Sequence, residues 1–241
     1  MKKYISVIII LLVVVLLLSC VMIFREISQS KEEKADFDAL TQAVVQNEDS
    51  QIDKDAEVLR KRNLTPLFAE NPDCIGWICI EGTEVDYPVM YTPTETQKYL
   101  HRNFEGEDST GGVPFLQENT TLDGDHLIIY GHNMRNGSMF ADVTNYADEA
   151  YCEAHPTIEF ETAEGVRYYD VVAVALLDKN DAWYGFIMSE TAAAFDSAVS
   201  AVTEKAVYQT EVVPTYGKQL LTLSTCYGSD DGRIVVISIE R

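Results

Sequence analysis

Positive charge is scarce in this sequence. Its 241 residues include 18 Lys and Arg against 39 Asp and Glu, which gives a formal net charge of −21. Because nucleic-acid binding depends on cations that neutralise phosphates and release their counterions, this deficit excludes DNA or RNA as an expected partner. It also excludes a broad basic face for an anionic lipid surface. A single Arg or Lys among so many acids should therefore matter locally.

Cysteine is rare as well. Five cysteines stand at positions 20, 74, 79, 152 and 226, and an odd number leaves at least one thiol unpaired. If Cys74 and Cys79 share one strand, they point to opposite faces and cannot form a bridge. The sequence has no paired CxxC motifs and no His pair at ligand spacing, so it predicts neither a disulfide framework nor a zinc site. We expect no metal and no cofactor.

One long uncharged run lies near the N-terminus. Residues 4–24 carry no charged side chain and follow Lys2 and Lys3. A helix of about 20 residues spans roughly 30 Å, the thickness of a bilayer core. The run is longer than the core of a cleaved signal peptide, and it continues past a poorly matching lipobox at Cys20. We predict that residues 1–27 are an uncleaved single-pass membrane anchor, which leaves the rest of the chain outside the cell by the positive-inside rule.

Residues 28–63 are polar and rich in Lys, Glu, Asp and Gln. Their apolar residues recur at spacings of three and four, which is typical of one or two amphipathic helices. These residues are Phe37, Leu40, Val44 and Val45, and further on Ile52, Ala56 and Leu59. The region is either a solvated stalk or a set of N-terminal helices that pack on the domain at 64–241.

From residue 64 onward, short apolar strands alternate with turn residues. Pro88 places one strand at an edge or a bulge. Residues 189–203 have helical spacing instead. The expected strands are 75–80, 85–91, 112–116, 126–130, 157–161, 166–177, 219–225 and 234–239. The pattern predicts a mainly β fold, namely a closed or nearly closed barrel of seven or eight strands, with N-terminal helices and one late helix.

Cys226 is the candidate nucleophile. It ends the apolar strand 219–225 and precedes the polar turn 227–232. A buried structural cysteine would more naturally lie in mid-strand, whereas a strand end exposes the thiol on a rigid support. If the strand that begins near Arg233 is its neighbour, the guanidinium returns beside the thiol. There a cation favours the thiolate and stabilises an oxyanion.

A nucleophilic cysteine usually needs a proton carrier, and the sequence has four histidines. His132 is the candidate because it follows an apolar strand, as Cys226 does. His101 and His155 lie in polar or loop segments, and His126, which follows acidic residues, is expected at the surface. The alternative for His132 is a ring satisfied by the backbone of its loop.

Together these residues resemble the sortases, the cysteine transpeptidases of Gram-positive surfaces. The similarity rests on Thr222–Cys226 with Arg233 downstream and Tyr130–Asn133 upstream. It is nearest to class B and covers roughly residues 64–241. The segments that match class B are 71–78, 86–89, 112–116 and the helix at 189–203 before the cysteine strand. The Asp-Pro-aromatic lid of pilin-polymerising sortases is absent from the sequence.

The resemblance implies a membrane-anchored transpeptidase with a sortase-like β-barrel. Its first partners would be surface proteins with a C-terminal sorting motif, which it would cleave after Thr through a Cys226 acyl-enzyme. Its second partner would be a peptidoglycan precursor, whose amine receives the acyl group. His132 would carry the proton, and Arg233 would fix the substrate and stabilise the oxyanion. By position, the residues implied to contact the sorting peptide are Leu100, Tyr184 and Ser224.

Several alternatives stay open. The same three residues would serve a surface cysteine protease, in which water takes the acyl group. A non-enzymatic surface module would instead bury the cysteine. Leu100 is either a wall of the peptide groove or a core residue. Asp230 or Asp231 either orients Arg233 or only forms an acidic turn.

Overall fold

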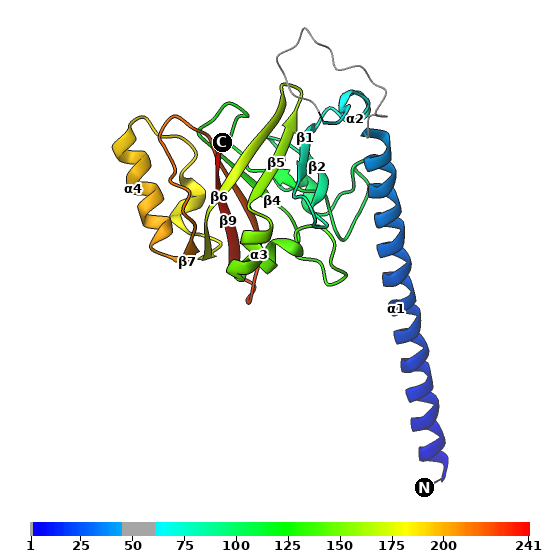
Figure 1. The fold of residues 1–241 in the computed structure, drawn as a ribbon. Helices are drawn as coiled ribbons and strands as arrows, with labels where there is room; N and C mark the ends of the chain where they lie inside the picture. The colour runs from blue at the N-terminus through cyan, green and yellow to red at the C-terminus, as the bar shows by residue number, and fades with distance from the viewer. Residues whose placement is uncertain (1, 45–60) are drawn as a thin grey trace. The chain divides into compact units, whose positions relative to one another are not determined.

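A computed structural model describes residues 2–44 and 61–241 (Figure 1). The described chain forms two compact units, one that ends at Ala39 and one that begins at Leu40. The first unit is the greater part of one long helix, and the second contains the β-sheet and every candidate site residue.

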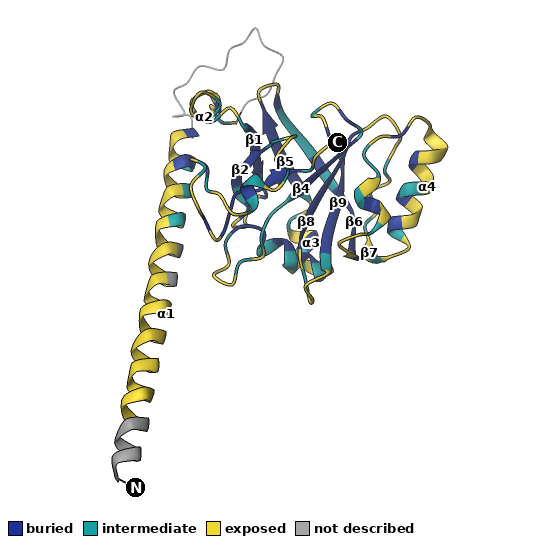
Figure 2. Cartoon of the chain, turned by 180° about the vertical axis from the view of Figure 1, so that it is seen from behind, coloured by how far each residue is buried: buried dark blue, intermediate teal, exposed yellow. Residues whose placement is uncertain are grey.

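Helix α1 spans Lys2–Val44 without a break. From Ile9 onward it is long and apolar enough to cross a membrane by length and composition, and an 18-residue stretch of it has a mean hydropathy of 2.7. Figure 2 shows its apolar stretch as exposed in the chain taken alone. The polar region after it continues the same helix to Val44. The repeat expected at Ile52, Ala56 and Leu59 lies outside the described residues.

The second unit is a closed β-barrel. Eight of its strands follow one another in the order β5-β1-β2-β3-β4-β8-β9-β6, and β6 pairs with β5 to close the ring. A ninth described strand, β7, lies outside the barrel against β6. The strands are β1 (Cys74–Cys79), β2 (Asp86–Met90), β3 (Phe115–Leu116), β4 (His126–Tyr130), β5 (Thr157–Thr162), β6 (Gly165–Asp178), β7 (Ala206–Gln209), β8 (Leu220–Cys226) and β9 (Gly232–Glu240). The predicted fold class is confirmed.

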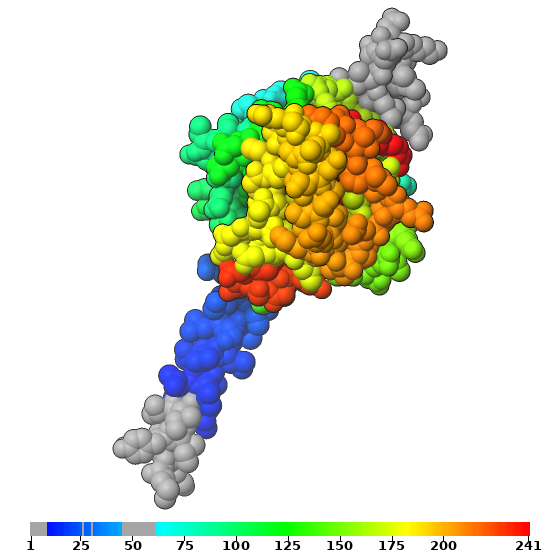
Figure 3. Space-filling view, turned by 90° about the vertical axis from the view of Figure 1, so that its left-hand side faces the viewer, coloured from blue at the N-terminus to red at the C-terminus, as the bar shows by residue number. Residues whose placement is uncertain are grey.

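Short helices connect the strands. After α1, the α-helices are α2 (Thr65–Glu70), α3 (Glu149–Ala154) and α4 (Ala192–Thr203), and the 3₁₀ helices are η1 (Lys98–Leu100), η2 (Asp142–Ala147) and η3 (Ala182–Gly185). The predicted late helix begins at Ala192 rather than at 189, because Thr191 caps it by accepting the backbone N–H of Ala194. Its buried face packs on β6 and β9. Figure 3 shows α4 and its flanking segments at the surface of the molecule.

Two strands differ from the sequence prediction. The third strand is shorter than 112–116, because Gly112 has a positive φ of 60° and Pro114 has no N–H for a ladder. Strand β7 was not predicted, since its four residues are too short to show a clear period. The placement of Pro88 is confirmed: β2 pairs with β1 along its length but with β3 only at Met90.

The surface position predicted for His126 is wrong. Its side chain is fully buried, where Nδ1 donates to the carbonyl of Phe186 at 2.5 Å and Nε2 accepts from the hydroxyl of Thr222 at 2.8 Å. That hydroxyl accepts the indole N–H of Trp183 at 3.2 Å. A carbonyl can only accept, so the network requires the neutral Nδ1–H tautomer. The sequence misled because acidic neighbours flank the residue, whereas its partners come from distant segments.

Acid should weaken the fold through His126. Burial lowers the pKa of this imidazole from 6.5 to about 4. The unfolded chain therefore binds more protons between these values, and the stabilisation from His126 is lost as pH falls through this window, by up to about 3 kcal/mol. We expect Tm to fall less steeply between pH 7 and 4.5 in His126→Gln than in the wild type. His155→Gln is the control, and equal slopes in all three proteins would contradict the assignment.

Candidate active site

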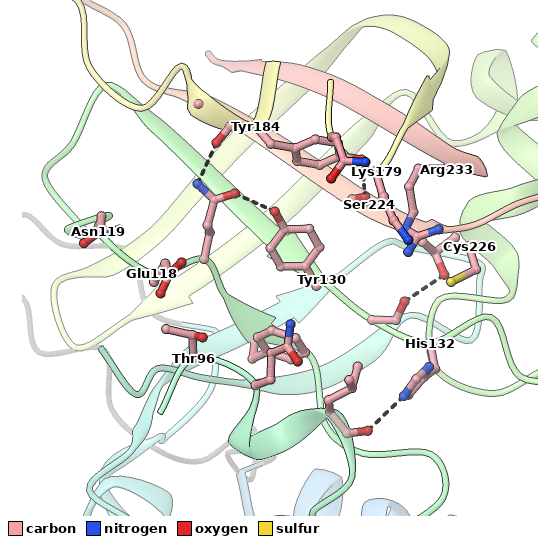
Figure 4. A pocket seen from close by; sticks show the side chains of 18 of the residues that line it. Thr96, Glu118, Asn119, Tyr130, His132, Lys179, Tyr184, Ser224, Cys226 and Arg233 are labelled. Carbon is pink, nitrogen blue, oxygen red and sulfur yellow. Dashed lines mark hydrogen bonds between the residues drawn. The ribbon is translucent and has the colours of Figure 1, made fainter. Parts of the chain in front are cut away.

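One pocket of about 660 Å³ brings together all six residues singled out in the sequence (Figure 4). Its walls come from β4, β8, β9 and the segments around η1 and η3. Figure 4 shows Thr96, Glu118 and Asn119 on the side of the pocket away from Cys226. The six residues are Leu100, His132, Tyr184, Ser224, Cys226 and Arg233.

Cys226 is exposed at the end of an otherwise buried strand. The six residues of β8 before it, Leu220–Thr225, are all buried. Strand β9 lies antiparallel to β8 and places Arg233 directly opposite Cys226. The expectation that the two strands are neighbours is therefore confirmed. The thiol faces solvent on a support that the barrel core holds rigid.

The Arg233 guanidinium is oriented by its own turn. Nη1 donates to the carbonyl of Gly232 at 2.8 Å and to the carbonyl of Asp230 at 3.0 Å. The carboxylate of Asp231 pairs with the ammonium of Lys179 at 2.5 Å. Lys179, and more weakly Arg233, lowers the pKa of Asp231. Asp230 thus orients Arg233 through its backbone, and the carboxylate of Asp231 has a different cation as its partner.

His132 follows β4 by two residues and has a backbone partner. Its Nε2 lies 2.8 Å from the carbonyl oxygen of Leu100, so Nε2 carries a proton and donates it. Burial lowers the pKa of His132, although the bond to Leu100 opposes this shift. The ring is therefore mainly neutral at pH 7. The imidazole of His101 stacks on it, with ring centroids 5.5 Å apart.

Parallel pairing brings the two strand ends together. Strands β4 and β8 run parallel in a register that sets Tyr130 beside Ser224, so His132 and Cys226 each lie two residues beyond this pair. Backbone and side-chain bonds extend the pairing past the strands. The N–H of Gly131 donates to the carbonyl of Ser224 at 3.3 Å, and the hydroxyl of Thr225 donates to the carbonyl of Gly131 at 2.7 Å.

Asn133 and Gly131 complete this contact, and neither was predicted to do so. The side-chain amide of Asn133 donates to the carbonyl of Cys226 at 3.1 Å. A Cβ at Gly131 would lie 2.6 Å from the ring of Phe140, so only glycine fits there. Both residues belong to the segment that suggested His132, but their bonds to the distant strand have no signature in the sequence.

The far part of the pocket wall is a chain of hydrogen bonds through Tyr184. Its hydroxyl lies 2.9 Å from the Ser224 hydroxyl, and its carbonyl accepts the side-chain amide of Gln117 at 2.9 Å. The Tyr130 hydroxyl donates to the same Gln117 at 2.5 Å. Burial raises the pKa of Tyr130 and Tyr184, so both remain neutral donors. Leu100 is partly exposed in this pocket rather than fully buried.

The described residues offer no evident metal centre. No group of three or more His, Cys, Asp or Glu side chains within them is arranged to hold a metal ion. The pocket presents a thiol, an imidazole and a guanidinium, with tyrosine and serine hydroxyls along one wall.

Comparison with known proteins gives one family. A family model for the sortase domain matches residues 78–239. Sortase B of Listeria monocytogenes is 34% identical over 180 residues, which cover 72% of this chain and 72% of the relative. Sortase B of Staphylococcus aureus is 26% identical over an alignment that covers 99% of this chain and 97% of the relative.

Solved structures of similar proteins share the fold. A Staphylococcus aureus sortase B–substrate complex matches with a TM-score of 0.77 at 26% identity, and covers 89% of this chain and 98% of that chain. Sortase B from Bacillus anthracis, in complex with AAEK1, matches with a TM-score of 0.76 at 25% identity and the same coverage.

Proposed function

This chain belongs to the sortase family, in class B, and is a cysteine transpeptidase; on that premise we propose that it anchors surface proteins to the cell wall. It would cleave a C-terminal sorting motif after Thr and transfer the protein to an amine of a peptidoglycan precursor. The observation that supports this most is the exposed Cys226 directly opposite Arg233, in one pocket with His132.

The chemistry follows from the three side chains. The Cys226 thiol gives its proton to the imidazole of His132, which becomes an imidazolium. The thiolate attacks the carbonyl carbon after Thr and forms a C–S bond, and Arg233 stabilises the oxyanion. The C–N bond then breaks, and His132 gives its proton to the leaving amine. In the second half, the incoming amine attacks the thioester and loses a proton to His132, and the thiolate leaves. His132 thus serves as acid and then as base.

Product analysis tests transpeptidation against hydrolysis. The full-length enzyme is incubated with a sorting peptide, with and without an amine acceptor. We expect the amide-linked product whenever the acceptor is present. Free acid as the main product at saturating acceptor would identify a cysteine protease instead. No turnover of any sorting peptide, together with an inert thiol, would indicate a surface module without enzymatic activity.

We also propose that Leu100, Tyr184 and Ser224 contact the sorting peptide. All three line the pocket, and Tyr184 shares a hydrogen bond with Ser224. The Staphylococcus aureus relative was solved as a substrate complex, which supports a peptide site in this fold. The polar contact and the partly exposed leucine would give the groove one hydrogen-bonding wall and one apolar wall.

Tyr184→Ala is expected to lower kcat/KM for the peptide several-fold, because it removes both the ring and the hydroxyl from the wall. Tyr184→Phe keeps the ring and should recover part of the loss. Steady-state kinetics give the effect, and Tm checks the fold. If Tyr184→Ala and Leu100→Ala both leave the kinetics unchanged and only the latter lowers Tm, Leu100 is a core residue and the groove lies elsewhere.

Residues 1–27 are proposed as the membrane anchor, followed by a polar region at 28–63 and the catalytic domain at 64–241, outside the cell. The apolar helix and the two lysines before it support this topology. Protease added to intact protoplasts should digest the domain, whereas release of the full-length chain into the medium would contradict the anchor.

A further inference from the structure

His101 contacts the imidazole of His132 on a face that the mechanism does not use. The two rings stack with centroids 5.5 Å apart and planes 25° apart. His101 directly follows Leu100, whose carbonyl oxygen accepts the Nε2–H of His132 at 2.8 Å. One short segment therefore touches the same ring twice, once at its face and once at its edge.

This segment is held in place by the backbone. The N–H of Val113 donates to the carbonyl of Tyr99 at 3.0 Å, and that of Ser109 to the carbonyl of His101 at 3.1 Å. A Cβ at Gly112 would lie 2.6 Å from the Leu100 carbonyl oxygen, which is a distance that only glycine allows. The His101 side chain is exposed to solvent. Its backbone is held in place by the bonds described above.

The charges around His101 are mostly paired. Its flanking cations have carboxylate partners, Lys98 with Asp73 at 2.6 Å and Arg102 with Asp108 at 2.8 Å. Across the stack lies His132. The loop that follows His132 carries Arg135, and the pocket that His132 lines also carries Cys226 and Arg233. Burial is the main cause that lowers the pKa of His132, and the charge of His101 lowers it further.

Resting on the proposed role of His132, we propose that His101 is a positioning residue of the transpeptidation reaction. It holds the plane of the His132 ring through the stack and, when protonated, opposes a second positive charge on that ring. Like charges this close repel. Protonated His101 therefore lowers the pH at which His132 and Cys226 are both protonated. The enzyme is inactive in that doubly protonated state.

The test uses the full-length chain in detergent micelles with ¹³C-labelled histidine. NMR follows the titration of His132 in the wild type, in His101→Phe, which keeps a stacked ring without charge, and in His101→Gln, which removes both. His155→Phe is the control, because His155 also packs against an aromatic ring, that of Tyr151, but does not line the pocket. The same proteins are assayed for kcat/KM against pH.

We expect the ratio of charged to neutral His132 at pH 5.5 to rise roughly three- to fourfold in both His101 variants. This is the factor that two unit charges 5.5 Å apart give in bulk water. The acid limb of kcat/KM should move to higher pH in both. The maximum of kcat/KM should stay near the wild-type value in His101→Phe and fall several-fold in His101→Gln.

An unchanged His132 titration in both variants overturns the electrostatic part of this inference and leaves the proposed function standing. An equal loss of maximal kcat/KM in both variants overturns the positioning by the stack. If the His132 titration moves while the acid limb does not, His132 is not the proton carrier. That result would remove the proposed mechanism, and this inference with it.

Discussion

Cys226→Ala is expected to abolish the acyl-enzyme completely, while the barrel stays folded. The Cys226 sulfur is the only protein atom that bonds to the acyl group in the proposed reaction, so no other side chain of the pocket replaces it. Because the residue is exposed at a strand end, its side chain contributes little packing, and the free energy of unfolding should change by less than about 0.5 kcal/mol. Intact-mass measurement after incubation with a sorting peptide shows the adduct or its absence.

Cys79→Ala is the matched control for this experiment. Cys79 lies on β1, away from the pocket, and burial raises the pKa of its thiol to about 11. The Cys79→Ala protein should still form the acyl adduct. An adduct of normal mass on the Cys226→Ala protein would show that the nucleophile is another residue.

His132→Ala and Arg233→Ala are expected to have the next largest effects. Loss of the proton carrier should lower kcat/KM about 10²–10⁴-fold, the usual contribution of general acid–base catalysis. Loss of an oxyanion donor should lower kcat about 10²–10³-fold. Arg233→Lys keeps the charge but loses the planar fork, so its activity should lie between those of the wild type and Arg233→Ala.

Arg241→Ala controls for the loss of one positive charge. Arg241 is exposed, pairs with Asp170 at 2.6 Å and does not line the pocket. Its removal should leave kcat/KM within about twofold of the wild-type value, since surface substitutions away from a site have small effects. Near-normal transpeptidation in His132→Ala or Arg233→Ala would exclude that residue from its proposed role.

The barrel was predictable because its strands are apolar and bounded by turn residues. The same pattern located Cys226 and His132, since both follow the last apolar residue of a strand. Pairing of β8 with β9 was also inferable, because only a short polar turn separates Cys226 from Arg233. For the strands, for Cys226 and His132 and for the β8–β9 pairing, the sequence pattern that makes the prediction lies within a few residues of the predicted position.

The partners that come from distant segments could not be predicted. The carbonyl of Leu100 that orients His132 is a backbone group, and every residue has one, so no residue type marks it. The burial of His126 depends on Trp183 and on Phe186, which lies 60 positions away in the sequence. The acidic residues next to His126 predict a surface position, but packing against residues distant in the sequence buries its side chain.

The parallel pairing of β4 and β8 also decides how the enzyme responds to heat. The bond from Thr225 to Gly131 joins residues 94 positions apart, and the strands behind it are buried. Contacts this distant in sequence form slowly during folding, and they open only when the sheet itself opens. We therefore expect His132 and Cys226 to separate by cooperative unfolding of the barrel rather than by local fraying, and we expect activity to persist up to the melting transition and to disappear together with it.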